Sequence, residues 1–170
     1  MVLLTEAIKL TFFPAMMAFA ASSDLLTMTI ANRVSLILVG GFALLAVLTG
    51  TGADDLLWHV AAAASVLVVV FIFFTRGWIG GGDAKLAAAT VLWLGFAHLV
   101  AYLFSASILG GALTLLIIYF RKAPLPAVFV GRAWAERLHR SDCGVPYGIA
   151  LAAAALIVSP QTEWMTAVAR

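Results

Sequence analysis

Apolar residues fill six stretches of the chain, and short polar segments separate them. Crossing the hydrocarbon core of a membrane takes about 20 mostly apolar residues in helical form. The pattern therefore predicts an all-α integral membrane protein, a bundle of six transmembrane helices. The predicted spans are residues 5–22, 33–49, 56–74, 84–99, 102–120 and 145–159.

The long apolar stretch 84–120 needs a separate argument. A helix over this whole stretch would be about 55 Å long at 1.5 Å per residue, too long for one span and barely enough for two. Gly95 and His98 mark the predicted break. We therefore expect a tight hairpin of two short helices here.

Composition indicates lipid as the main surroundings of the chain. Hydrophobic residues make up 64% of the 170 residues, and charged residues 11%. A soluble domain is roughly half apolar and about a quarter charged. A chain of this size has too little interior to hide the excess from water. We expect residues 1–170 to form a single membrane-embedded domain. The net charge of +2 gives no indication of nucleic acid as a partner.

Basic residues orient the predicted spans. Eight of the ten Lys and Arg residues fall in loops on one side, and the other side has only Lys9, Arg170 and the acidic pair Asp54-Asp55. The positive-inside rule places the first side in the cytoplasm, so both termini are expected outside. The eight residues are Arg33, Arg76, Lys85, Arg121, Lys122, Arg132, Arg137 and Arg140.

The cytoplasmic loop 121–144 has an amphipathic pattern. Val130, Trp134 and Leu138 would share one helical face, with charged residues opposite and Arg137 breaking the pattern. This predicts a short helix that lies in the membrane interface.

Two aspartates are the candidate catalytic groups. Ionisable groups at membrane depth are costly, so each is a functional candidate. Asp24 lies at the cytoplasmic end of the first predicted span, and Asp83 at the cytoplasmic start of the fourth. A bundle could bring them together. The alternative is a helix-end charge at the interface for Asp24 and a helix N-cap for Asp83.

A pair of close carboxylates can hydrolyse a peptide bond without a metal or cofactor. The two groups share one proton, because both cannot easily be charged. The charged carboxylate takes a proton from the attacking water, and the protonated one assists the carbonyl oxygen and the leaving nitrogen. Gly80-Gly81-Gly82 directly precedes Asp83, giving G-x-G-D. Glycines permit positive φ and close approach of another chain, so this loop could seat an extended substrate.

Three segments carry a resemblance to a known family. They are Asp-Leu-Leu-Thr-Met-Thr-Ile-Ala-Asn at 24–32, Gly-Gly-Gly-Asp-Ala-Lys-Leu at 80–86, and Val-Pro-Tyr-Gly-Ile-Ala at 145–150. Together they resemble the motifs of the type IV prepilin leader peptidases, G-x-G-D aspartic peptidases, in their short Flp/Tad-type form. Ala31 replaces the family's usual proline and leaves the acid in place.

The resemblance implies a bacterial inner-membrane endopeptidase with Asp24 and Asp83 as its catalytic pair. It would remove the leader of a prepilin or pseudopilin at the cytoplasmic face, after a glycine and before an apolar helix. Lys85 has two interpretations, a membrane anchor or a group that tunes Asp83 or meets the substrate. The supporting or substrate-binding candidates are Gly80, Gly82, Lys85 and Asn32.

The cysteine content separates this chain from the larger family members. Those carry two C-x-x-C pairs, linked to N-methylation of the cleaved pilin. Cys143 is the sole cysteine, so the sequence predicts no intrachain disulfide and no cysteine-based zinc site. We expect peptidase activity without methyltransferase activity, and no cofactor.

Two other functions fit parts of the pattern. A presenilin-like intramembrane protease would use the same chemistry, but Ser23 stands where that family has tyrosine, and no Pro-Ala-Leu motif follows. A small transporter or assembly scaffold could use the two aspartates as ion sites. Transporters often show internal repeats, and this sequence has no evident repeat.

Overall fold

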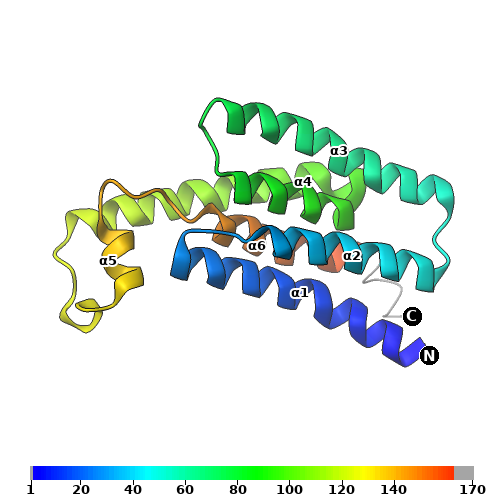
Figure 1. Ribbon diagram of the computed structural model, residues 1–170, viewed down its shortest axis with the longest axis horizontal. Coiled ribbons are helices and arrows are strands. Elements are labelled where there is room, and N and C mark those ends of the chain that lie inside the picture. Colours follow the sequence, from blue (N-terminus) through cyan, green and yellow to red (C-terminus); the bar gives the residue numbers. More distant parts are fainter. Residues whose placement is uncertain (1, 163–170) are drawn as a thin grey trace.

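The computed structural model describes the backbone of residues 2–162 and the side chains of residues 10–162. This part of the chain is helical and contains no β-strand (Figure 1), which confirms the all-α prediction. Two single 3-10 turns, Ala127–Phe129 and Ser159–Gln161, accompany the α-helices. The helices are α1 (Val2–Thr27), α2 (Asn32–Thr49), α3 (Ala53–Thr75), α4 (Gly81–Lys122), α5 (Ala133–His139) and α6 (Tyr147–Val158).

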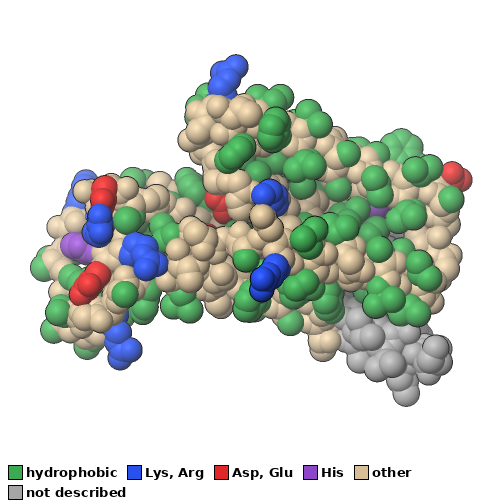
Figure 2. Space-filling model, viewed as in Figure 1, with side chains coloured by type: hydrophobic (Ala, Val, Ile, Leu, Met, Phe, Trp, Pro, Cys, Tyr) green, Lys and Arg blue, Asp and Glu red, His purple; other side chains and the backbone are tan. Residues whose placement is uncertain are grey.

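Four of these helices, α1 to α4, are long and apolar enough to cross a membrane, and α6 is a shorter apolar helix. Large apolar side chains cover much of the visible surface (Figure 2), as expected where lipid replaces water. The chain is therefore a multi-pass membrane protein. Helix α1 continues to Thr27, beyond the predicted end at residue 22, so Asp24 lies within the helix.

Helix α4 is two helical segments joined at Gly95. This residue has φ 68° and ψ −178°, a conformation open essentially to glycine alone. The chain reverses direction there, and the second segment runs back past the start of the first towards α5 (Figure 1). The predicted hairpin is thus present. The predicted end of its first helix at residue 99 is wrong, because His98 already belongs to the second segment.

An aromatic cluster around Trp93 joins α1, α2 and α4. The indole N–H of Trp93 donates a buried hydrogen bond of 3.0 Å to the carbonyl of Leu38. The ring of Phe12 stacks on Trp93 at 5.7 Å between centroids, and Phe13 and Phe42 pack around the same indole. A buried polar N–H requires such a partner, so this contact fixes α2 against α4.

Small residues bring the central helices close together. The first segment of α4 and helix α6 bury alanines along their length, including Ala87, Ala89, Ala152 and Ala154. Side chains of this size let helix backbones approach closely within a membrane. Helix α3 differs, because it buries only Ala62 of its alanines, together with Val66.

The loop between α4 and α6 folds back towards α1. Arg137 of α5 donates a hydrogen bond of 2.8 Å to the carbonyl of Leu26, near the end of α1. The predicted apolar stripe is wrong at Val130, which is exposed and precedes the helix. Gly131, with φ 82°, turns the chain between Val130 and α5.

Charge is distributed unevenly along the molecule. Figure 2 shows Lys and Arg side chains from the α5 end to the middle of the molecule, and an acidic group at the opposite tip. The α5 end also holds the end of α1 and the starts of α2, α4 and α6 (Figure 1). Arg170 and the side chain of Lys9 lie outside the described residues. We keep the cytoplasmic orientation of this end as a prediction.

Reporter fusions can test the predicted six crossings. Reporters placed within 75–83 and within 121–144 should both be cytoplasmic, because these segments carry the basic residues. Reporters at the two termini should both be outside. A C-terminal reporter on the same side as 121–144 would require an odd number of crossings and contradict the arrangement.

Candidate active site

Three chain segments meet at the α5 end of the bundle, and each contributes one group to the candidate site. Asp24 lies in the last turn of α1, Asp83 is the third residue of α4, and Gly148 is the second residue of α6. Ile30, in the short connection between α1 and α2, packs against both Gly82 and Gly148. The site is therefore built from segments that are distant in sequence.

Asp24 is held by the start of α6. Its side chain is 5% exposed, and its Oδ2 accepts a hydrogen bond of 2.7 Å from the backbone N–H of Gly148. The first N–H groups of a helix have no partner within the helix and favour negative charge nearby. A buried carboxyl group needs such a partner, so the start of α6 holds the Asp24 side chain in place.

Asp83 faces two neighbours from its place in the first turn of α4. Its carboxylate interacts with the backbone of Gly80, the N-cap of the helix, and with the charge of Asp24. The alternative that Asp83 is itself the N-cap is therefore wrong. An acid at the third helical position commonly reaches back to the N-cap N–H. Closing the start of α4 in this way does not require a second acid, so the interaction of Asp83 with Asp24 needs another explanation.

The glycines before Asp83 serve close packing within the chain. A Cβ on Gly82 would lie 3.1 Å from Cβ of Ile30 and 3.2 Å from its carbonyl oxygen. A Cβ on Gly80 would lie 3.0 Å from Oδ2 of Asp83. The positive φ in this loop belongs to Gly77, at 71°. Ile30 occupies the space beside Gly82, and a role of this loop in seating a substrate stays a prediction.

Lys85 and Asn32 are brought together. The Lys85 ammonium donates a hydrogen bond of 2.8 Å to Oδ1 of Asn32, which joins the start of α4 to the start of α2. The described structure has no ion pair between Lys85 and Asp83. The interpretation that Lys85 tunes Asp83 is therefore not supported by a direct contact between the two side chains. Lys85 is exposed, which leaves a contact with substrate open to it.

Residues 11–115 match the type IV leader peptidase family. The chain belongs to this family. The matched range contains Asp24, the glycine loop and Asp83, and it ends before α6. No curated protein and no solved structure matches the chain significantly. Membership in a peptidase family indicates a protease, and it agrees with the resemblance that the sequence motifs carry.

The backbone donor of Gly148 lies outside the part that matches the leader peptidase family, and sequence reasoning assigned it no role. Its signal was present in Pro146-Tyr147-Gly148, a proline and a glycine at the start of an apolar helix. A Cβ at Gly148 would lie 2.6 Å from Cδ1 of Ile30 and 2.8 Å from Oδ2 of Asp24. Glycine is therefore required here by contact with the aspartate.

The remaining acidic groups with described side chains lie apart from this site. Asp54 and Asp55 are exposed in the first turn of α3, at the opposite end. Asp142 pairs with Arg140 in the loop before α6. The hydrogen bond from Arg140 holds the pKa of the Asp142 carboxyl below its usual value. Within residues 10–162, no three His, Cys, Asp or Glu side chains are grouped as metal ligands.

Replacing Gly148 by alanine should impair leader cleavage. The new methyl group would displace Asp24 or Ile30, and misplacing a reacting group by about 1 Å can cost roughly a hundredfold in rate. We expect at least about a tenfold loss, measured with a prepilin peptide and purified protein. Gly144→Ala is the control, because a Cβ there meets nothing within 4 Å. Full activity of Gly148→Ala would show that this contact does not position Asp24.

Proposed function

We propose that this member of the leader peptidase family is an aspartic endopeptidase that uses Asp24 and Asp83 as its catalytic pair. The observation that carries the proposal is the convergence of the two aspartate-bearing segments: Ile30 packs on both Gly82 and Gly148, the Gly148 N–H binds Asp24, and Asp83 interacts with the charge of Asp24. The two aspartates come from helices α1 and α4.

The pair supports a direct attack of water on a peptide carbonyl. One carboxylate accepts a proton as the water oxygen bonds to the carbonyl carbon, and the protonated partner donates to the carbonyl oxygen. The tetrahedral intermediate then collapses, the C–N bond breaks, and the leaving nitrogen receives a proton from the dyad. Each turnover consumes one water and returns the shared proton.

The proposed substrate is a prepilin-like protein with a short leader and a following apolar helix. The site lies at the end of apolar helices, so an apolar segment would lie in the membrane while the leader stays outside the hydrocarbon. Eight of the ten Lys and Arg residues fall in the loops predicted on this side, and the positive-inside rule assigns it to the cytoplasm. We therefore place cleavage at the cytoplasmic face of a bacterial inner membrane.

Family membership favours this function over the two alternatives. A presenilin-like protease would use the same acids, but the matching family is that of type IV leader peptidases. A transporter or scaffold would not require Asp83 to lie within electrostatic reach of an Asp24 carboxyl group held by a backbone donor. The proposal therefore depends on the family match for the substrate class and on the site for the chemistry.

Asp24→Asn and Asp83→Asn should each abolish cleavage. Asparagine keeps the shape of the side chain and cannot exchange the proton, and general acid–base catalysis contributes roughly 10²–10⁴-fold. The measurement is cleavage of a synthetic prepilin by purified protein in lipid, read by mass spectrometry. Asp54→Asn, at the opposite end, is the control. Substantial cleavage by either variant would remove that aspartate from the dyad.

The protein should cleave without modifying its product. Cys143 is partly buried, and the segment that contains it is short for a cofactor-binding domain. Pilin cut by the purified protein should have an unmodified new N-terminus, and Cys143→Ser should cleave at the wild-type rate. A methylated N-terminus, or loss of cleavage in Cys143→Ser, would contradict the expectation.

A further inference from the structure

The donor that holds Asp24 lies on a segment with little regular structure of its own. Residues 141–146 connect α5 to α6 as turns and irregular backbone. Pro146, with φ −74° and ψ 81°, makes a tight turn in which the Tyr147 N–H donates to the Val145 carbonyl at 2.9 Å. Such a turn does not fix where the Gly148 N–H points, so other contacts must do so.

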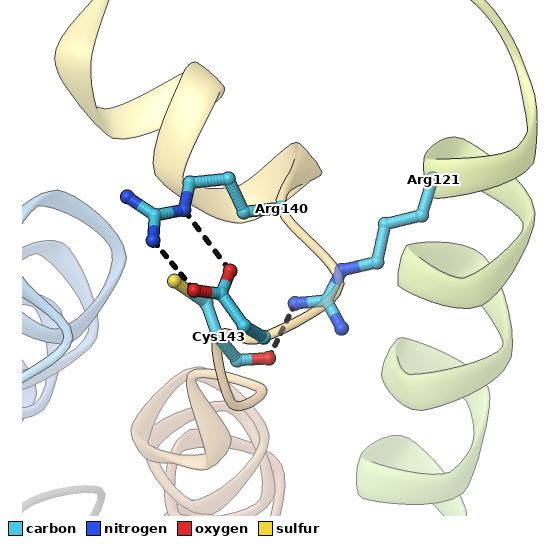
Figure 3. A network of polar contacts seen from close by, with 4 residues as sticks. Arg121, Arg140 and Cys143 are labelled. Carbon is cyan, nitrogen blue, oxygen red and sulfur yellow. Dashed lines mark hydrogen bonds and ion pairs between the residues drawn. The ribbon is translucent and has the colours of Figure 1, made fainter.

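Arg121, at the end of α4, makes the strongest of these contacts. Its Nη2 donates to the carbonyls of Cys143 at 2.9 Å and Gly144 at 2.8 Å, and its Nε donates to the carbonyl of Leu138 at 2.9 Å. Figure 3 shows Arg121 reaching from its helix to Cys143. Backbone carbonyls outside regular hydrogen bonding take side-chain donors as partners. The rigid fork of a guanidinium serves several at once, which an ammonium on a flexible stem does less well.

A second contact holds the same segment further along α4. The Tyr147 hydroxyl lies 2.9 Å from Oγ1 of Thr114, and a Cβ on Gly110 would lie 3.1 Å from the Tyr147 ring. Gly110, Thr114 and Arg121 share one face of α4, because positions four and seven residues apart recur on the same side of a helix. This face therefore aligns the start of α6 at several points.

We propose that Arg121 and Tyr147 are positioning residues of the peptidase, which hold the segment 143–148 on α4 so that the Gly148 N–H stays directed at Asp24. This inference rests on the proposed function of Asp24. Both residues and Gly148 lie outside the range that matches the family. Arg121 touches neither aspartate, so its effect on the reaction passes through the backbone of the segment.

Arg140 supplies a matched control from the same loop. It pairs with Asp142 (Figure 3), and both side chains are about two-thirds exposed, at 66% and 63%. An exposed ion pair of this kind contributes little. Arg140→Gln removes the same charge as Arg121→Gln and leaves the hydrogen bonds to residues 138, 143 and 144 in place.

Steady-state cleavage of a prepilin peptide by the full-length protein in lipid gives the first measurement. Arg121→Gln should lower kcat roughly ten- to a hundredfold, because the Asp24 carboxylate loses its fixed donor. KM should stay within about twofold, since no substrate contact is removed. Arg121→Lys should recover part of the loss, and Tyr147→Phe should lower kcat by a smaller factor. Arg140→Gln should match the wild type.

Hydrogen–deuterium exchange of the segment 144–152 gives a second measurement that does not depend on activity. Arg121→Gln should speed exchange of this segment, and Arg140→Gln should not. If wild-type protein fails to cleave any prepilin peptide, the proposed function fails, while the exchange data still decide whether Arg121 holds the segment. If Arg121→Gln does not accumulate in the membrane, Arg121→Lys and Tyr147→Phe carry the same test.

Three results would overturn the inference. The first is unchanged kcat in Arg121→Gln, or in Arg121→Lys and Tyr147→Phe where the glutamine variant does not accumulate. The second is a raised KM with unchanged kcat, which would make Arg121 a substrate contact. The third is a lowered kcat without faster exchange of 144–152, which would mean that Arg121 acts by another route.

Discussion

The candidate site depends on close packing of backbone around Ile30. Gly148, at the start of α6, approaches this residue more closely than a larger side chain would allow, and Gly82, at the start of α4, leaves only 3.1 Å between an added Cβ and the Cβ of Ile30. Ile30 in turn follows directly on the end of α1, which carries Asp24. Two glycines and one buried isoleucine therefore draw three helix ends together. The consequence is that Asp83 comes within electrostatic reach of Asp24, and that a backbone N–H reaches the Asp24 carboxylate.

Much of the fold could be predicted because the requirements of a membrane are simple. Apolar runs long enough to span a membrane predicted the helices. The predicted bounds were wrong mainly at helix ends: α1, for example, continues through polar residues to Thr27. The break at Gly95 was predictable because an overlong apolar stretch must reverse and glycine alone readily adopts the observed φ and ψ. Successive spans run in opposite directions, so the end of the first span and the start of the fourth lie on the same side of the membrane. This predicted Asp24 and Asp83 at one end of the bundle.

The contacts that refine the site were not predictable. Gly148 and Asp24 are 124 residues apart, and no periodicity in the sequence pairs a backbone N–H with a particular carboxylate. In the sequence, Arg121 is only one of the eight basic residues that orient the spans in the membrane. Its three carbonyl partners come near it only after the loop has folded back. The loop helix was predicted one turn too early, since nothing in its pattern shows that Gly131 turns the chain. Local patterns thus located the acids, and tertiary packing supplied their partners.

The packing of Gly82 on Ile30 is the contact to measure. In a Cys143→Ser background, cysteines at positions 30 and 82 would place two Cβ atoms about as close as the 3.1 Å found between Ile30 Cβ and a Cβ on Gly82. That separation is within a few tenths of an ångström of disulfide geometry. Mild oxidation in membranes should therefore cross-link this pair rapidly, as read by mass spectrometry, and should leave a pair at positions 40 and 82 unlinked. Failure of the 30–82 pair to cross-link, in protein that inserts normally, would contradict the convergence of the two aspartate-bearing segments.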